Sequence, residues 1–122
     1  MTAETWKVRV LKADGPTNAN PIKVQAGEPL EIVGEEDDGW VWCRDRAGRE
    51  DWMPLSYMTA GGEENRGNKR TALSNYDSTV FSVEVGEEFQ AEREVSGWLW
   101  CKSMQGKWGW IRVNNVERIS QA

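Results

Sequence analysis

The 122-residue chain contains no histidine and only two cysteines, and this shortage removes several classes of protein. A structural zinc site normally takes four Cys or His ligands, so two cysteines alone cannot build one. Without histidine there is no Ser–His or Cys–His pair to activate a nucleophile. We therefore expect no metal centre, no cofactor and no enzymatic activity.

Long apolar runs and excess positive charge are also missing. No stretch approaches the ~20 apolar residues needed to span a bilayer, and residues 1–10 carry charges in place of the apolar core of a signal peptide. The chain has 15 Lys and Arg against 20 Asp and Glu, a net charge of −5. Because an acidic surface repels phosphate backbones and anionic lipids, we expect neither a nucleic-acid nor a membrane partner. We predict a soluble, cytoplasmic protein.

Tryptophan, in contrast, is abundant, and six of its eight copies follow an internal repeat. The segment GWVWCR at residues 39–44 returns as GWLWCK at residues 97–102. Further matches keep the same order along the chain, and self-similarity of this kind indicates a duplicated structural unit. The further matching pairs are Gly48 with Gly106, Trp52 with Trp110, and residues 24–28 with residues 83–87.

The repeat predicts two domains, residues 1–60 and residues 72–122. Between them, residues 61–71 are polar and rich in glycine, as expected of a linker. Domains of about 50–60 residues are near the lower limit for a self-sufficient core. The supply of bulky indole side chains suits such small cores.

Within each repeat the pattern is that of short β-strands separated by turns. Side chains alternate along residues 40–44 and 98–102 as they do on the two faces of a strand. Residues 46–49 and 104–107 contain glycine and favour hairpin connections. No segment shows a convincing helical period. We predict an all-β protein of two tandem small β-barrels with about five strands each.

Cys43 and Cys101 occupy equivalent inward positions of the two repeats. Two such core positions cannot meet in one disulfide without disrupting both cores, so we expect buried free thiols. Free thiols fit a reducing compartment. Trp42 and Trp100 are expected to pack over a neighbouring strand or between the domains.

The order and spacing of these short motifs resemble the SH3 domain family, and the matches cover nearly the whole chain. Each motif is weak alone, but the duplicated set is fairly specific. In the first repeat the matching positions are Gly27-Glu28, residues 38–40 (DGW), Gly48 and residues 52–58 (WMPLSYM). In the second they are residues 72–73 (AL), Tyr76-Asp77, Gly86-Glu87, Gly97-Trp98, Gly106 and residues 109–111 (GWI).

The resemblance implies a groove lined by aromatic side chains that accepts an extended, proline-rich segment. A polyproline II segment is already stiff, so ordering it costs little entropy. Flat Trp and Tyr faces pack against proline rings, and their polar hydrogens bond to ligand carbonyls. Acidic side chains beside the groove pair with a ligand Arg or Lys and fix its direction.

In the first repeat the resemblance places this groove at an aromatic and proline set preceded by an acidic run. Residues 11–14 lack the tyrosines of the family's first strand, which leaves one side of the groove poorer in aromatic rings. The groove residues are Trp40, Trp52, Pro54 and Tyr57, and the acidic wall is Glu35, Glu36, Asp37 and Asp38.

The second repeat keeps Tyr76, Trp98 and Trp110 as candidate ligand contacts. It carries Arg112 where the family has the groove proline and Asn115 where it has the tyrosine. A proline-rich ligand should therefore bind the second domain weakly, and the first domain is the better candidate.

We predict a non-catalytic module that binds an extended proline-rich or basic peptide. Two alternatives remain open at this point. In one, the two barrels pack on each other through their tryptophan faces and form a scaffold without a peptide ligand. In the other, the protein is an exported SH3-like protein that binds cell-wall peptides. The sequence leaves the oligomeric state open.

Overall fold

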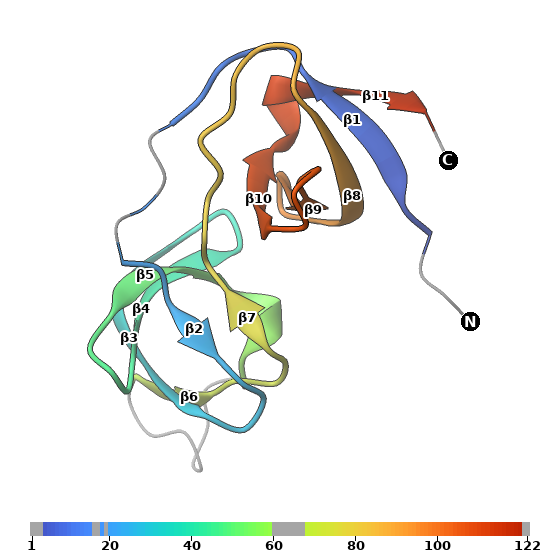
Figure 1. Ribbon diagram of the computed structural model, residues 1–122. Coiled ribbons are helices and arrows are strands. Elements are labelled where there is room, and N and C mark those ends of the chain that lie inside the picture. The colour runs from blue at the N-terminus through green and yellow to red at the C-terminus, as the bar shows by residue number, and fades with distance from the viewer. Residues whose placement is uncertain (1–3, 16–17, 19, 60–67, 121–122) are drawn as a thin grey trace. The chain divides into compact units, whose positions relative to one another are not determined.

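The structure is a computed structural model that describes residues 4–15, 18, 20–59 and 68–120. These residues form β-strands and two short 3-10 helices, with no α-helix among them, which confirms the all-β prediction. No described helix is long and apolar enough to cross a membrane. The chain divides into two compact units, which Figure 1 shows. We call Ala19–Ser78 the continuous unit, and Met1–Asn18 with Thr79–Ala122 the divided unit.

The continuous unit contains a four-stranded antiparallel sheet and a short two-stranded one (Figure 1). The larger sheet has the order β5-β4-β3-β6 and the smaller pairs β2 with β7. A 3-10 turn, η1 (Leu55–Tyr57), follows directly on β5. The strands are β2 (Lys23–Val24), β3 (Pro29–Asp37), β4 (Trp40–Asp45), β5 (Glu50–Pro54), β6 (Lys69–Thr71) and β7 (Tyr76–Asp77).

The β3–β4 connection is a two-residue hairpin turn. Both of its central residues, Asp38 and Gly39, have positive φ, at 53° and 88°. Turns of this kind match the right-handed twist of the strands, and Asp-Gly is among their favoured sequences. The turn brings the end of β3 directly opposite the start of β4, with Asp37 facing Trp40.

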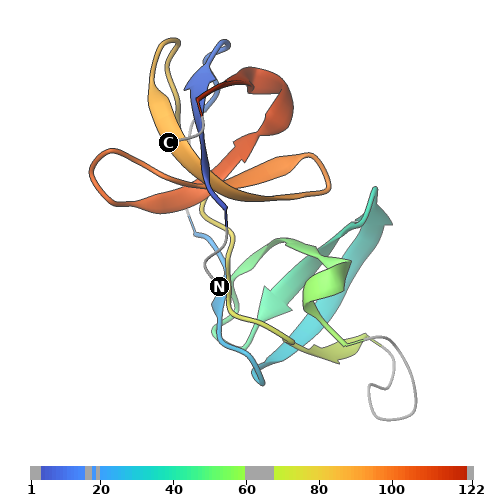
Figure 2. The same ribbon diagram turned by 90° about the vertical axis from the view of Figure 1, so that its right-hand side faces the viewer.

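The divided unit is built on a five-stranded antiparallel sheet of order β10-β9-β8-β1-β11. Figure 2 shows its β8–β9 and β9–β10 turns projecting at opposite sides of the view. A second 3-10 turn, η2 (Val113–Asn115), leads into the last strand. The strands are β1 (Trp6–Val10), β8 (Glu88–Val95), β9 (Trp98–Lys102), β10 (Trp108–Arg112) and β11 (Val116–Ser120).

Each unit buries its own set of apolar side chains, as alternation along the strands dictates. In both units the core includes the cysteine of the repeated GWxWC segment. The core of the continuous unit contains Ile22, Val24, Leu30, Val41, Cys43, Met53, Met58, Ala72 and Tyr76. The core of the divided unit contains Val8, Val10, Val83, Phe89, Ala91, Leu99, Cys101 and Ile111.

The two sequence repeats exchange strands. Strand β1 comes from the first sequence repeat, yet it lies between β8 and β11 of the second. In the opposite direction, β6 pairs with β3, and β7 pairs with β2 of the first repeat. Ala72 also forms a bridge to Met58. Each unit is therefore completed by chain from the other repeat.

This exchange corrects the predicted domain boundaries. The N-terminal residues up to Asn18 belong with the second repeat, and residues 72–78 belong with the first. Most of the predicted linker, residues 61–67, lies outside the described residues, but its end forms β6 and is part of a sheet. The chain passes between the units after Asn18 and again after Ser78.

Candidate functional site: an aromatic face on the continuous unit

The predicted groove residues of the first repeat share one face of the β4–β5 hairpin. In the strand register, Trp40 lies opposite Pro54, and Trp42 lies opposite Trp52. The rings of Trp42 and Trp52 meet edge to face, with centroids 5.5 Å apart. We call these four residues, together with Tyr57 and Tyr76, the aromatic face.

Tyr57 and Tyr76 extend this face from η1 and β7. Their rings also meet edge to face, with centroids 5.5 Å apart. The phenol of Tyr76 donates a hydrogen bond of 2.7 Å to the main-chain oxygen of Trp52. The sequence assigned Tyr76 to the second domain, but the strand exchange delivers it to the first. Tyr76 is 6% exposed, so its ring lies beneath the exposed aromatic side chains and supports them.

Burial of Tyr76 fixes the protonation of its phenol. Desolvation raises the pKa of Tyr76 well above its ordinary value, and the nearby negative charge of Asp51 acts in the same direction. The phenol therefore stays neutral and continues to donate to Trp52 at physiological pH. This hydrogen bond ties β7 to β5 at the candidate site.

The members of the aromatic face differ in how much surface they present. Trp40 is 9% exposed and Pro54 is buried, so both support the face from below. Trp52 is 39% exposed, while Trp42 and Tyr57 are half-buried. A ligand would first meet Trp52, Trp42 and Tyr57.

The predicted acidic wall lies at the end of the β3–β4 hairpin. Glu35, Glu36, Asp37 and Asp38 are all exposed. Asp37 is the cross-strand partner of Trp40, and Glu36 is the partner of Val41. The run is therefore held beside the aromatic face by strand pairing, and it presents negative charge to solvent.

Sequence reasoning missed Glu50, which borders the aromatic face. The indole nitrogen of Trp42 donates to its carboxylate at 3.0 Å, and Arg44 donates to it at 3.1 Å. These two hydrogen bonds lower the pKa of Glu50, that of Trp42 first. The alternation along β4 and β5 was the signal that could have found it, because Glu50, Trp52 and Pro54 share one side of the strand.

The equivalent surface of the divided unit is built differently. Arg112 lies over the ring of Trp98, with its guanidinium carbon 4.5 Å from the ring centroid. The carboxylate of Asp14 forms an ion pair with the guanidinium of Arg112 at 3.3 Å. It also accepts a hydrogen bond of 2.9 Å from the side-chain amide of Asn115. The chain's own polar groups thus engage the positions where a proline ligand would lie.

Trp110, predicted as a ligand contact, is 2% exposed and belongs to the interior. It packs against Trp100, with ring centroids 5.0 Å apart. Its main chain is bonded on both sides, because its N–H donates to Thr79 and its carbonyl accepts from Phe81. Trp98 is half-buried beneath Arg112.

Both cysteines are free and buried, as the sequence predicted. Desolvation raises the pKa of each thiol to about 12, and in Cys43 the negative charge of Asp51 adds to the effect. Thiols that stay protonated are poor nucleophiles. In the part of the chain that the structure describes, no three His, Cys, Asp or Glu side chains gather as a metal ion would require.

Comparison with known proteins adds limited information on the family. No protein-family model matches the chain. The chain is 30% identical over 87 residues to Protein nervous wreck of Drosophila melanogaster, and the match covers 65% of the chain. The same match spans only 8% of the length of that relative. The all-β fold is consistent with the SH3-like resemblance of the sequence.

Proposed function

We propose that the chain is a non-catalytic module whose continuous unit binds an extended proline-rich peptide carrying a basic residue. The observation that carries this proposal is that Trp52, Trp42 and Tyr57 present partly exposed rings on one unit, supported by the buried Trp40, Pro54 and Tyr76. Flat rings suit the faces of a polyproline II helix, whose ordering cost is small. The exposed acidic run beside Trp40 suits an arginine or lysine of the ligand.

In the divided unit, the chain's own side chains close the surface equivalent to the aromatic face, which favours the alternative without a peptide ligand for this unit. Arg112 already covers Trp98, and Asp14 holds it there. Opening this surface would separate an ion pair and a cation–π contact before a ligand gained anything in return. In our proposal the second sequence repeat supplies Tyr76 to the continuous unit, and the divided unit does not take a proline-rich ligand. Two buried thiols fit a reducing compartment, and a cytoplasmic location is part of the proposal.

The test is a titration of the isotope-labelled full chain with a synthetic peptide of Pro-x-x-Pro spacing and one terminal arginine, followed by NMR. A shallow groove of this kind should give a micromolar dissociation constant, about −8 kcal/mol. Shifts should centre on Trp52, Tyr57 and the residues of the β3–β4 turn. A peptide with glutamate in place of arginine should bind more weakly.

A matched pair of variants makes the test specific. Trp52 and Trp108 are 39% and 38% exposed, so truncating either side chain should leave the core intact. Trp52→Ala should weaken peptide binding about tenfold, as expected when an interfacial tryptophan is removed. Trp108→Ala should leave it unchanged. Equal losses in both variants, or shifts that avoid the aromatic face, would contradict the proposal.

A further inference from the structure

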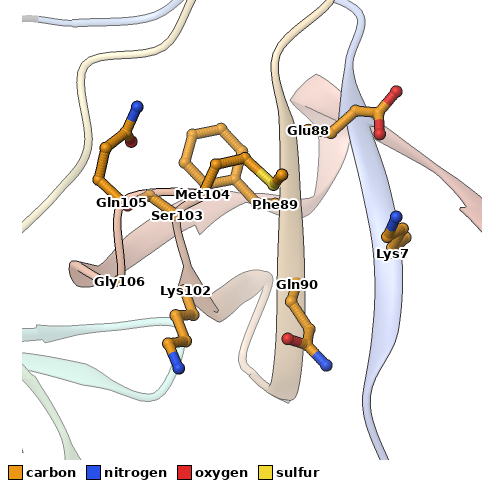
Figure 3. A pocket seen from close by; sticks show the side chains of 9 residues that line it. All are labelled: Lys7, Glu88, Phe89, Gln90, Lys102, Ser103, Met104, Gln105 and Gly106. Atoms are coloured by element: carbon orange, nitrogen blue, oxygen red, sulfur yellow. The ribbon is translucent and has the colours of Figure 1, made fainter. Parts of the chain in front are cut away.

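The divided unit has a hollow of about 430 Å³ beside its β9–β10 turn. Figure 3 shows Met104 in front of the Phe89 ring near the centre, with Lys102 and Lys7 on either side. Its size falls within the range of small-ligand sites. Its walls come from β1, β8, β9 and the β9–β10 turn, and the lining residues are Lys7, Glu88, Phe89, Gln90, Lys102, Ser103, Met104, Gln105 and Gly106.

The strand register explains why these side chains gather. Lys7 lies opposite Gln90, Gln90 lies opposite Lys102, and Lys102 lies opposite Trp108. Directly paired residues of neighbouring strands point to the same side of a sheet. The four side chains therefore form a continuous row across β1, β8, β9 and β10, and the row contains two positive charges and no negative one.

Comparison with the continuous unit shows what is unusual about Lys102. Its equivalent there is Arg44, which lies between Glu31 and Glu50 and forms ion pairs of 3.2 and 3.0 Å with them. In the divided unit Gln90 and Trp108 occupy the two positions of these glutamates. The same place in the fold thus keeps its positive charge but loses both of its acidic partners.

The ammonium of Lys102 lies over the ring of Trp108, 5.9 Å from its centroid, but no acidic side chain among the described residues replaces the lost glutamates. Neither Lys7 nor Lys102 has a carboxylate within ion-pair distance in the described part of the chain. The one acidic residue of the lining, Glu88, is engaged by Arg9 at 3.3 Å. In a chain of net charge −5, this hollow is a local region of positive charge. Its electrostatic complement is a ligand that carries carboxylates.

The hollow is also partly apolar. Met104 is 77% exposed at its edge, and Phe89 forms part of its lining. The thioether of methionine adapts its shape to different partners, and exposed methionines are common at binding surfaces. A bare anion would leave this apolar part unused, whereas a peptide with both acidic and aliphatic side chains would use both parts.

We infer that this hollow is a second peptide site, specific for an acidic segment with an aliphatic residue between its carboxylates. The carboxylates pair with Lys7 and Lys102, and the aliphatic side chain packs on the exposed Met104, which lies over the largely buried Phe89. The site is independent of the aromatic face, whose ligand is rich in proline and basic. The chain would then join two partners of opposite charge.

The probe is a synthetic peptide, acetyl-Glu-Glu-Leu-Glu-Glu-amide, added to the isotope-labelled full chain and followed by NMR. Shifts should appear at Gln90, Lys102 and Met104. The peptide in which Gln replaces every Glu should not bind. Two exposed ion pairs of up to about 1 kcal/mol each predict that the Lys7→Gln/Lys102→Gln double variant binds about tenfold more weakly.

Two single variants sharpen the test. Gln90→Glu restores the acidic neighbour that Arg44 has in the continuous unit, so it should weaken binding although it removes no contact. Lys107→Gln is the matched control, because this lysine is exposed in the same hairpin but does not line the hollow. It should bind the peptide as the unchanged protein does.

Three results would overturn the inference. The first is equal binding of the Gln peptide, and the second is unchanged affinity in the double variant. The third is an equal pattern of shifts with inorganic phosphate at the same concentration, which would reveal a plain anion site. Shifts confined to Trp52 and Tyr57 would also reject it, while leaving the proposed function to its own test.

Discussion

Each of the two units is completed by a residue from the other sequence repeat, but the chemistry of that residue differs between the units. Val24 and Val83 are equivalent in the repeat, and each pairs with a residue donated by the other repeat. In the continuous unit that residue is Tyr76, and in the divided unit it is Asp14. The donated side chain thus sets the character of the surface, aromatic in one unit and charged in the other.

The side chains around the donated residue match its chemistry, aromatic in the continuous unit and polar in the divided unit. Tyr76 meets the ring of Tyr57, whereas Asp14 accepts a hydrogen bond from Asn115, which replaces that tyrosine. Where the aromatic face has Pro54, the divided unit has Arg112, and its guanidinium is paired with Asp14. Changes at several positions are mutually consistent, which is why a single fold supports an open aromatic face in one copy and a closed polar one in the other.

The largest loss of stability is expected from a variant that tests the strand exchange. Val8 belongs to the first repeat but is 1% exposed in the core of the divided unit. A charge placed there has no partner, so Val8→Asp should destabilise the divided unit by more than about 4 kcal/mol. Amide hydrogen exchange should show protection lost at Phe89 and Leu99 and retained better at Val41.

The reciprocal variant completes that experiment. Ala72 belongs to the second repeat but is 2% exposed in the continuous unit. Ala72→Asp should therefore loosen Val41 and Met53 before Leu99. If each variant loosened its own repeat instead, the exchanged topology would be wrong.

Alkaline pH should act on both cores through the buried thiols. Their ordinary pKa of 9.0 is raised to about 12 in the folded protein. Below pH 9 the folded and unfolded states bind the same protons, so the contribution to stability is intact. Between pH 9 and 12 only the unfolded state releases them, so the stability falls as the pH rises.

Urea unfolding followed at several pH values measures this fall. The pKa of Tyr76 is also raised, so a further fall should begin above its ordinary value of 10. In a Cys43→Ala/Cys101→Ala double variant, whatever its stability at neutral pH, the decline between pH 9 and 10 should disappear. An unchanged decline would assign it to other groups.

Gly109 of the divided unit leaves room for the ring of Phe81. A Cβ at Gly109 would lie 3.0 Å from the ring of Phe81, which packs against the glycine. Gly109→Ala should cost about 1–3 kcal/mol of stability through overpacking. A Phe81→Leu change should recover part of that loss in the double variant, and additive losses in thermal unfolding would contradict the contact.

The smallest effect is expected at Asp14. Its ion pair with Arg112 is partly exposed to solvent, so Asp14→Asn should cost less than about 1 kcal/mol. The change should nevertheless release Arg112 from Trp98, and the indole signal of Trp98 should shift in NMR spectra. An unmoved signal would show that the cation–π contact holds Arg112 without its carboxylate.

Local patterns were sufficient for part of the fold. The repeat, the alternation along β4 and β9 and the glycine turns predicted short strands, and the inward positions of Cys43 and Cys101 were confirmed. The candidate site was predicted in part, because Trp40, Pro54 and Tyr57 lie close together along one hairpin and its following turn. Glu50 and Trp42 belong to the same alternation but were not recognised as neighbours of the site.

The sequence by itself determined that the chain is all-β, that it is duplicated and that each copy buries one thiol, because these properties depend on residues near one another along the chain. Only the tertiary structure decided which copy receives β1 and which receives Tyr76. Short alternating segments such as Trp6–Val10 could pair with strands of either sheet. The choice depends on core packing and strand pairing between residues far apart in the sequence, which no local pattern records.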